Sequence, residues 1–173
     1  MAVQVRNLLF PIAQQDVSTN NAQRLDMLKI RQGTIIHADA TAAIALSAPI
    51  DLPTSITVAN QLKTSINAHL ASACNAISGQ GSHIAVDGAN PVVAATAVDL
   101  PTTETLLNAC KTAHNAHIAL TTAHPVADAT NTVATANATD LPTSIALGTQ
   151  LITSVNAHFA MAMVEQAIQL IAP

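Results

Sequence analysis

Two histidines, an aspartate and an asparagine stand close together in the stretch NAHIALTTAHPVADATN, residues 115–131. His117 and His124 are seven residues apart, and Asp128 and Asn131 follow them. Imidazole and carboxylate groups at such spacing can bind a transition metal, transfer protons, or fix the local backbone through hydrogen bonds. The rest of the chain provides the evidence for choosing among these three roles.

The same residue types recur at fixed spacing along the chain. The tetrapeptide DLPT occurs three times, at 51–54, 99–102 and 140–143. Asn-Ala-His starts sixteen residues after the Asp of each DLPT, and another Asp stands twelve residues before it. A further histidine precedes that earlier Asp, by four residues in the second and third copies and by two residues in the first.

These recurrences define three units, at 37–69, 83–117 and 124–158, with a period of about 40 residues. A single catalytic site does not need three copies of its residues, so the repetition indicates a structural module. Residues 37–173 form the repeat body, and residues 1–36 form a predicted N-terminal arm with a short helix. The longer join between the first two units, ASACNAISGQGS, is predicted to be an exposed loop.

Each DLPT opens a stretch in which apolar residues recur at helical spacing, which predicts three amphipathic helices. Asp51, Asp99 and Asp140 are the predicted N-caps, because a carboxylate accepts the free N–H groups of a first turn and favours its positive dipole end. The prolines that follow lose no hydrogen bond in that turn. We expect helices of about 20 residues, roughly 30 Å long, the third continuing through MAMVEQAIQLIAP to residue 173.

The segments between the predicted helices, such as IAVDGANPVVAATAVD, have no helical stripe. About 16 extended residues can cover roughly 50 Å, which exceeds the length of one helix. The chain can therefore return to its starting end, so that the three helices lie parallel. An antiparallel bundle is the alternative, although its loops are usually shorter. The predicted fold is mainly α, with three helix-plus-extended-segment repeats forming a small bundle behind an N-terminal arm.

The repeated histidines are interpreted as parts of structural joints that close each unit. Those of Asn-Ala-His lie at predicted helix ends, where imidazole can bond the free terminal carbonyls. The Asp and Asn of the return segments can fix turns through their own backbone. The predicted joint positions are His37, Asp39, Asp51, His69, His83, Asp87, Asp99, His117, His124, Asp128, Asp140 and His158.

A metal site is the alternative for the same residues, with His117, His124 and Asp128 as its candidate ligands, since two histidines and one aspartate suit Zn²⁺. Their spacing matches no standard zinc motif and varies between units, so the sequence predicts no metal and no cofactor. Catalysis is disfavoured because no nucleophile recurs beside the histidines. GxSxG, P-loop, HExxH and GxGxxG motifs are absent from the sequence, which predicts a protein that is not an enzyme.

The composition favours a protein that works through contacts with other proteins. Only 9% of the residues are charged, and the net charge is −4. A neutral exterior of this kind is often covered by a partner. The chain has no basic cluster for nucleic acid and no apolar run long enough to span a membrane. Cys74 and Cys110 are isolated in the sequence and are predicted to be small hydrophobic residues.

Residues 115–143, NAHIALTTAHPVADATNTVATANATDLPT, resemble a repeat found in structural proteins of tailed bacteriophages. The resemblance extends over residues 37–158, although the first unit is shortened near His37 and the second has SGQGSH in place of TTAH. It implies a non-enzymatic component of the virion, synthesised in the cytoplasm of the host bacterium.

Within such a particle we expect a capsid decoration or accessory protein. A neck, tail or fibre-base component is the alternative, and a metal-binding helical repeat module is the alternative from another class. The expected partners are the major capsid protein or neck and tail proteins. The chain is also expected to form a homo-oligomer, such as a trimer.

Overall fold

The computed structural model describes residues 35–36, 39, 42–72, 83, 85–124, 127–161 and 163–164. This part of the chain contains the helices α2 (Leu52–Leu70), α3 (Leu100–Ile118) and α4 (Leu141–Phe159), each of 19 residues. A short strand β1 (Ile35–Ile36) pairs antiparallel with β2 (Met163–Val164). The predicted small, mainly α bundle is confirmed.

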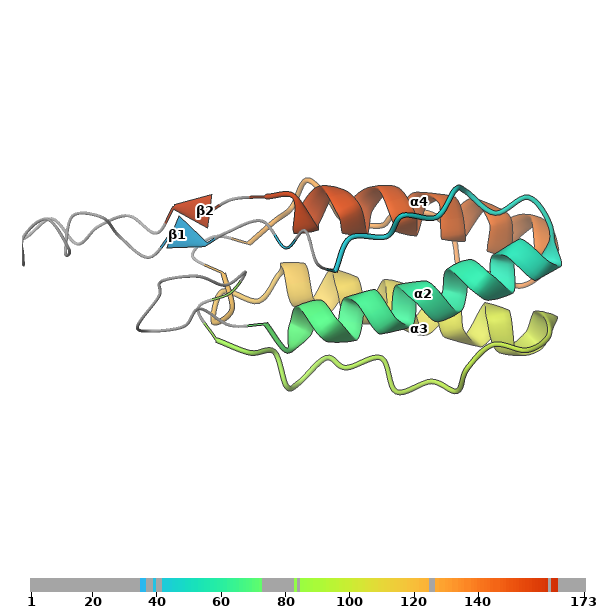
Figure 1. Ribbon diagram of the computed structural model, residues 1–173, viewed down its shortest axis with the longest axis horizontal. Coiled ribbons are helices and arrows are strands. Elements are labelled where there is room, and N and C mark those ends of the chain that lie inside the picture. Colours follow the sequence, from blue (N-terminus) through green and yellow to red (C-terminus); the bar gives the residue numbers. More distant parts are fainter. Residues whose placement is uncertain are drawn as a thin grey trace, which may run out of the picture. The chain divides into compact units, whose positions relative to one another are not determined.

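The three helices lie parallel, because each starts at the same end of the bundle and runs to the other (Figure 1). Each helix packs against the other two. The segments 85–98 and 127–139 carry the chain back along the bundle before the next helix begins, and segment 42–50 follows the same direction before α2 (Figure 1). Their length therefore permits the parallel arrangement, as predicted.

All three helices begin with the same hydrogen-bonded cap, which explains the DLPT repeat. Asp51, Asp99 and Asp140 are the N-caps, and each carboxylate accepts the N–H of the Thr three residues later, at 2.9, 3.0 and 2.8 Å. The Thr hydroxyl in turn accepts the N–H of the cap residue, which completes a capping box. The bond from this hydroxyl also lowers the pKa of each capping carboxyl.

Equivalent positions of the three helices supply the core. Val58, Leu106 and Leu147 share one position of the repeat, and each is at most 2% exposed. One turn later the equivalent residues are Leu62, Cys110 and Leu151, all fully buried. Burial raises the pKa of the Cys110 thiol to about 12, so this cysteine is a core residue, as predicted.

The asparagine of each Asn-Ala-His clamps a return segment onto the bundle. Its side-chain amide bonds both the N–H and the carbonyl of one residue in the segment of the next unit. The three clamps are Asn67 with Val92 (2.8 and 3.1 Å), Asn115 with Val133 (2.9 and 3.0 Å) and Asn156 with Ile44 (2.8 and 2.9 Å). Because the last helix clamps the first segment, the three units form a closed ring.

A second clamp near the helix starts occurs in only two of the units. Asn60 and Asn108 bond both backbone groups of Ala97 and Ala138. In the remaining unit the partner position holds Pro49, which has no N–H to donate, and the clamp position holds Thr149. The neighbouring Gly148 leaves room for the proline ring, since a Cβ there would lie 3.1 Å from Pro49 Cγ.

The predicted continuation of the third helix is wrong. Helix α4 ends at Phe159, where Ala160 is the C-cap, and β2 follows at Met163. The carbonyl of Phe159 accepts the N–H of Asp39 at 2.7 Å, so it does not serve a longer helix. The predicted helix of the N-terminal arm, the loop 73–82, Cys74 and residues 165–173 lie outside the described residues.

We expect the substitution Gly148→Ala to be better tolerated when Pro49 is also replaced by Ala. Alanine favours a helix over glycine by about 1 kcal/mol, but here its Cβ meets the proline ring. A double-mutant cycle followed by urea unfolding should give a favourable coupling of about 0.5–1 kcal/mol.

Gly88→Ala is the matched control, since a Cβ at Gly88 has no atom within 4 Å. Its effect on the free energy of unfolding should be the same with and without Pro49. A coupling near zero between Gly148 and Pro49 would contradict this account of the missing clamp.

Candidate metal centre

Five histidines converge at the ends of the helices. His69, His117 and His158 come from the last turns of α2, α3 and α4, whereas His83 and His124 precede the return segments. All five are at most 3% exposed. One ring nitrogen from each lies within 4.8 Å of those of the others. Each of the three units therefore contributes to one buried cluster of imidazoles.

Three aspartates orient the histidines of the helices. The Nδ1 atoms of His69, His117 and His158 lie 3.0, 2.9 and 2.9 Å from carboxylate oxygens of Asp39, Asp87 and Asp128, each within its own unit. The prediction that these imidazoles bond terminal helix carbonyls is thus wrong, because the aspartate carboxylates take their Nδ1–H groups.

The terminal carbonyls are instead occupied by the backbone of the same aspartates. Asp87 N–H donates to Leu70 O at 2.9 Å, and Asp128 N–H donates to Ile118 O at 2.8 Å. The bond from Asp39 to Phe159 completes the ring. Each aspartate therefore holds the end of the preceding helix with its backbone and an imidazole of its own unit with its side chain.

The aspartates also form the predicted turns. Asp87 accepts the N–H of Ala89 and of Asn90, at 3.0 and 3.2 Å, and Asp128 accepts those of Thr130 and Asn131, at 3.1 and 3.2 Å. Burial alone would raise the pKa of Asp87 and Asp128, but hydrogen bonds from asparagine and histidine outweigh it and lower the pKa of both. The two carboxylates are thus ionised hydrogen-bond acceptors.

The remaining histidines are oriented by backbone carbonyls. His83 Nδ1 lies 2.5 Å from Ser72 O, and His124 Nδ1 lies 3.2 Å from Leu120 O. A carbonyl only accepts, so both Nδ1 atoms carry the hydrogen. The carboxylates impose the same tautomer on the other three rings. In every neutral ring of the cluster, the free lone pair is therefore on Nε2.

These Nε2 lone pairs point at one another. His83 Nε2 lies 2.9 Å from His69 Nε2 and 3.1 Å from His117 Nε2. The Nε2 atoms of His124 and His158 are buried without a hydrogen-bond partner. Two neutral acceptors in such contact repel each other, and a buried acceptor without a donor costs about 1–3 kcal/mol. A cation at the centre of the cluster would accept these lone pairs and remove both the repulsion and the cost of the unpaired acceptors.

Protons do not readily supply that cation. Burial lowers the pKa of His117 to about 3, which the hydrogen bond to Asp87 only partly offsets. Burial likewise lowers the pKa of His158 to about 4. The imidazoles are consequently neutral near pH 7, which is the form that binds metal ions.

The sequence prediction placed other residues at the joints as well. Asp51, Asp99 and Asp140 cap the opposite ends of the helices and take no part in the cluster. His37 lies outside the described residues. His114 was not singled out; it is buried in α3, and its Nε2 bonds Asn131 O at 3.0 Å, outside the cluster of five.

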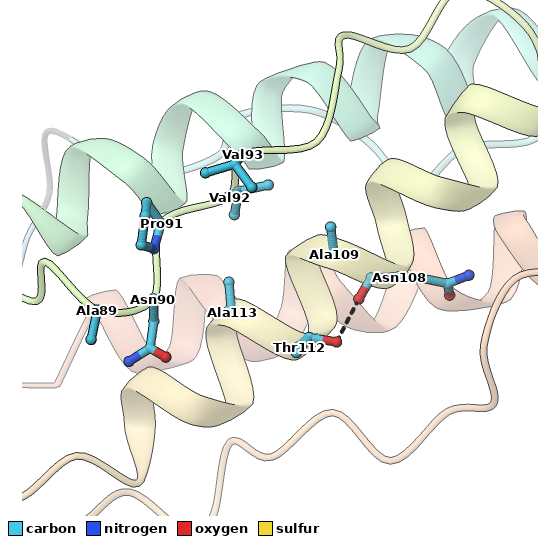
Figure 2. A pocket seen from close by; sticks show the side chains of 9 residues that line it. All are labelled: Ala89, Asn90, Pro91, Val92, Val93, Asn108, Ala109, Thr112 and Ala113. Atoms are coloured by element: carbon cyan, nitrogen blue, oxygen red, sulfur yellow. Dashed lines mark hydrogen bonds between the residues drawn. The ribbon is translucent and has the colours of Figure 1, made fainter.

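A pocket of about 420 Å³ lies elsewhere, between the return segment 89–93 and α3 (Figure 2). Its lining residues are Ala89, Asn90, Pro91, Val92, Val93, Asn108, Ala109, Thr112 and Ala113. None of these side chains carries an acidic or basic group, so the pocket offers none for acid–base chemistry.

Comparison with known proteins gave no match to a family model, to a curated protein or to a solved structure. Among the described helices, none has both the length and the apolar character needed to cross a membrane. The function is therefore inferred from the histidine cluster itself.

The hydrogen bonds predict the tautomer of each ring in metal-free protein at neutral pH. All five cluster histidines should carry the proton on Nδ1, measured by long-range ¹H–¹⁵N correlation NMR of the imidazoles. His114 is the internal control, because its Nε2 faces the Asn131 carbonyl and should carry the proton. A cluster ring protonated on Nε2 would contradict the assigned orientation.

Proposed function

We propose that this chain is a non-enzymatic structural module whose three helices are locked together by a metal ion bound to the histidine cluster. The observation that carries the proposal is the convergence of five buried imidazole nitrogens, all within 4.8 Å of one another. Imidazole suits late first-row ions such as Fe²⁺, Ni²⁺, Cu²⁺ and Zn²⁺.

The surroundings of the cluster favour a structural rather than a catalytic ion. The five histidines are at most 3% exposed, so substrate has no open approach to the ion. Structural metal sites are closed in this way, whereas catalytic sites keep a position open for water or substrate. Three ligands also have a carboxylate on the far side of the ring, which orients the imidazole and raises its basicity.

Metal binding would add directly to the stability of the bundle. The ligands come from residues as far apart in the sequence as His69 and His158, so the unfolded chain holds no preformed site. A ligand that binds only the folded state at 100 times its Kd stabilises it by about 2.7 kcal/mol. The described hydrophobic core includes one aromatic side chain, Phe159, and otherwise consists of smaller residues. The stabilisation that the metal adds is therefore substantial for this bundle.

A second proposal concerns the setting of the module. The resemblance of residues 115–143 to repeats of tailed bacteriophages supports a role in the virion, with capsid decoration preferred over a neck, tail or fibre-base position. The return segments add support, because Val93 and Val98 are 85% and 72% exposed. Apolar side chains on a weakly charged exterior favour contacts with other proteins.

Purified protein should contain about one metal ion per chain, because the cluster has a single centre. The double variant His117→Gln/His124→Gln should lose the ion and unfold at a lower temperature. The measurements are elemental analysis by mass spectrometry and thermal unfolding with and without a chelator. His114→Gln is the matched control and should retain the ion.

Two other results would contradict the proposed metal site. A wild-type protein without metal affinity, whose double variant loses only thermal stability, would support hydrogen-bonded joints without an ion. Retention of the ion by the double variant would contradict the role of His117 and His124 as necessary ligands.

The virion role predicts that the chain is present in purified particles of the phage that encodes it. Quantitative mass spectrometry, normalised to the major shell protein, should give a copy number close to that of the shell for a decoration protein. A much lower number would indicate a neck, tail or fibre-base component. Absence from the particle would contradict the virion role but leave the metal proposal intact.

A further inference from the structure

We propose that the histidine cluster is a six-coordinate site that prefers an octahedral divalent ion, such as Fe²⁺, Co²⁺ or Ni²⁺, over tetrahedral Zn²⁺. This inference rests on the proposed metal-binding function and adds the coordination number and the class of ion. It is drawn from the number, the separations and the symmetry of the converging nitrogens.

The number of imidazoles is the first argument. Structural zinc sites almost always hold four ligands, but five histidines converge here. A tetrahedral ion would leave one imidazole with its Nε2 lone pair buried and directed at the other ligands. The fifth imidazole would then retain the free-energy cost of a buried acceptor that has no hydrogen-bond donor or metal ion. An ion that takes five or more nitrogens removes this cost for every ring.

The separations of the ring nitrogens give the second argument. With metal–nitrogen bonds of about 2.1 Å, ligands at right angles lie about 3.0 Å apart, whereas tetrahedral ligands lie about 3.4 Å apart. The Nε2 atom of His83 lies 2.9 Å from that of His69 and 3.1 Å from that of His117. Both separations match adjacent corners of an octahedron.

The most distant nitrogens agree with the same geometry. Opposite corners of an octahedron with bonds of about 2.1 Å lie about 4.2 Å apart. All five nitrogens lie within 4.8 Å of one another. One ion can therefore reach every ring with small movements of the side chains.

The symmetry of the repeat gives the third argument. His69, His117 and His158 hold equivalent positions in the three units and form one triangle of ligands. His83 and His124 are equivalent to each other and belong to a second set. Two staggered triangles of ligands define an octahedron, and His83 lies close to two members of the first triangle, His69 and His117, as staggering requires. A tetrahedral site on the same axis would instead need three equivalent ligands and one unique ligand.

Five imidazoles leave one corner of the octahedron for a further ligand. A water molecule can fill it, and the burial of the five imidazoles keeps a substrate from reaching that corner.

The test is the spectroscopy of full-length protein stripped of metal and titrated with Co²⁺. Saturation at one equivalent tests the proposed metal-binding function independently of geometry. The six-coordinate site should then give the weak visible absorption of octahedral Co²⁺, and X-ray absorption should give five or six nitrogen or oxygen neighbours. Intense tetrahedral bands with four neighbours would overturn the six-coordinate assignment while leaving metal binding established.

Competition provides the second measurement. With equimolar Ni²⁺ and Zn²⁺, wild-type protein should retain mainly Ni²⁺, because an octahedral ligand set stabilises Ni²⁺ whereas Zn²⁺ has no such geometric preference. His124→Gln should shift the preference towards Zn²⁺ and His114→Gln should not. Preferential retention of Zn²⁺ by the wild type would contradict the proposal.

Discussion

The structure depends on one repeated pair of hydrogen bonds. They are made by the aspartate that lies beside the C-terminal end of each helix. Its backbone N–H bonds the terminal carbonyl of the preceding helix, and its carboxylate accepts the Nδ1–H of a histidine in its own unit. The first bond determines where the return segment leaves the bundle. The second determines which way the imidazole faces. Fold and site are therefore set by the same residue, represented by Asp87 in the second unit.

The parallel arrangement of the helices depends on a second set of hydrogen bonds, made by the asparagine clamps. Parallel helices need long connections, and an extended connection exposes backbone groups that require partners. The asparagine clamps supply those partners, as between Asn115 and Val133. The segments 85–98 and 127–139 are consequently bonded to the preceding helix at two clamp positions each.

The sequence alone predicted much of this fold, because its signals are local. The caps at Asp51, Asp99 and Asp140 follow from helix-start chemistry, and the length of the return segments favoured parallel helices. The convergence of the histidines is a property of the closed ring. Spacing within one unit gives no indication that His69 meets His83 and His117 from the next unit. The end of α4 was missed for the same reason, since Asp39 occupies the Phe159 carbonyl from 120 positions away.

The hydrogen bond between Asp39 and Phe159 joins the first unit to the last, in the same way that Asp87 joins the second unit to the first. The same contact joins each unit to the next, so three separate copies of one unit could in principle form the same ring. Pro49 and Gly148 lie together where the last unit meets the first. Because the three units belong to one chain, each has its own fixed neighbour, and a matched pair of residues can depart from the repeat at one contact alone.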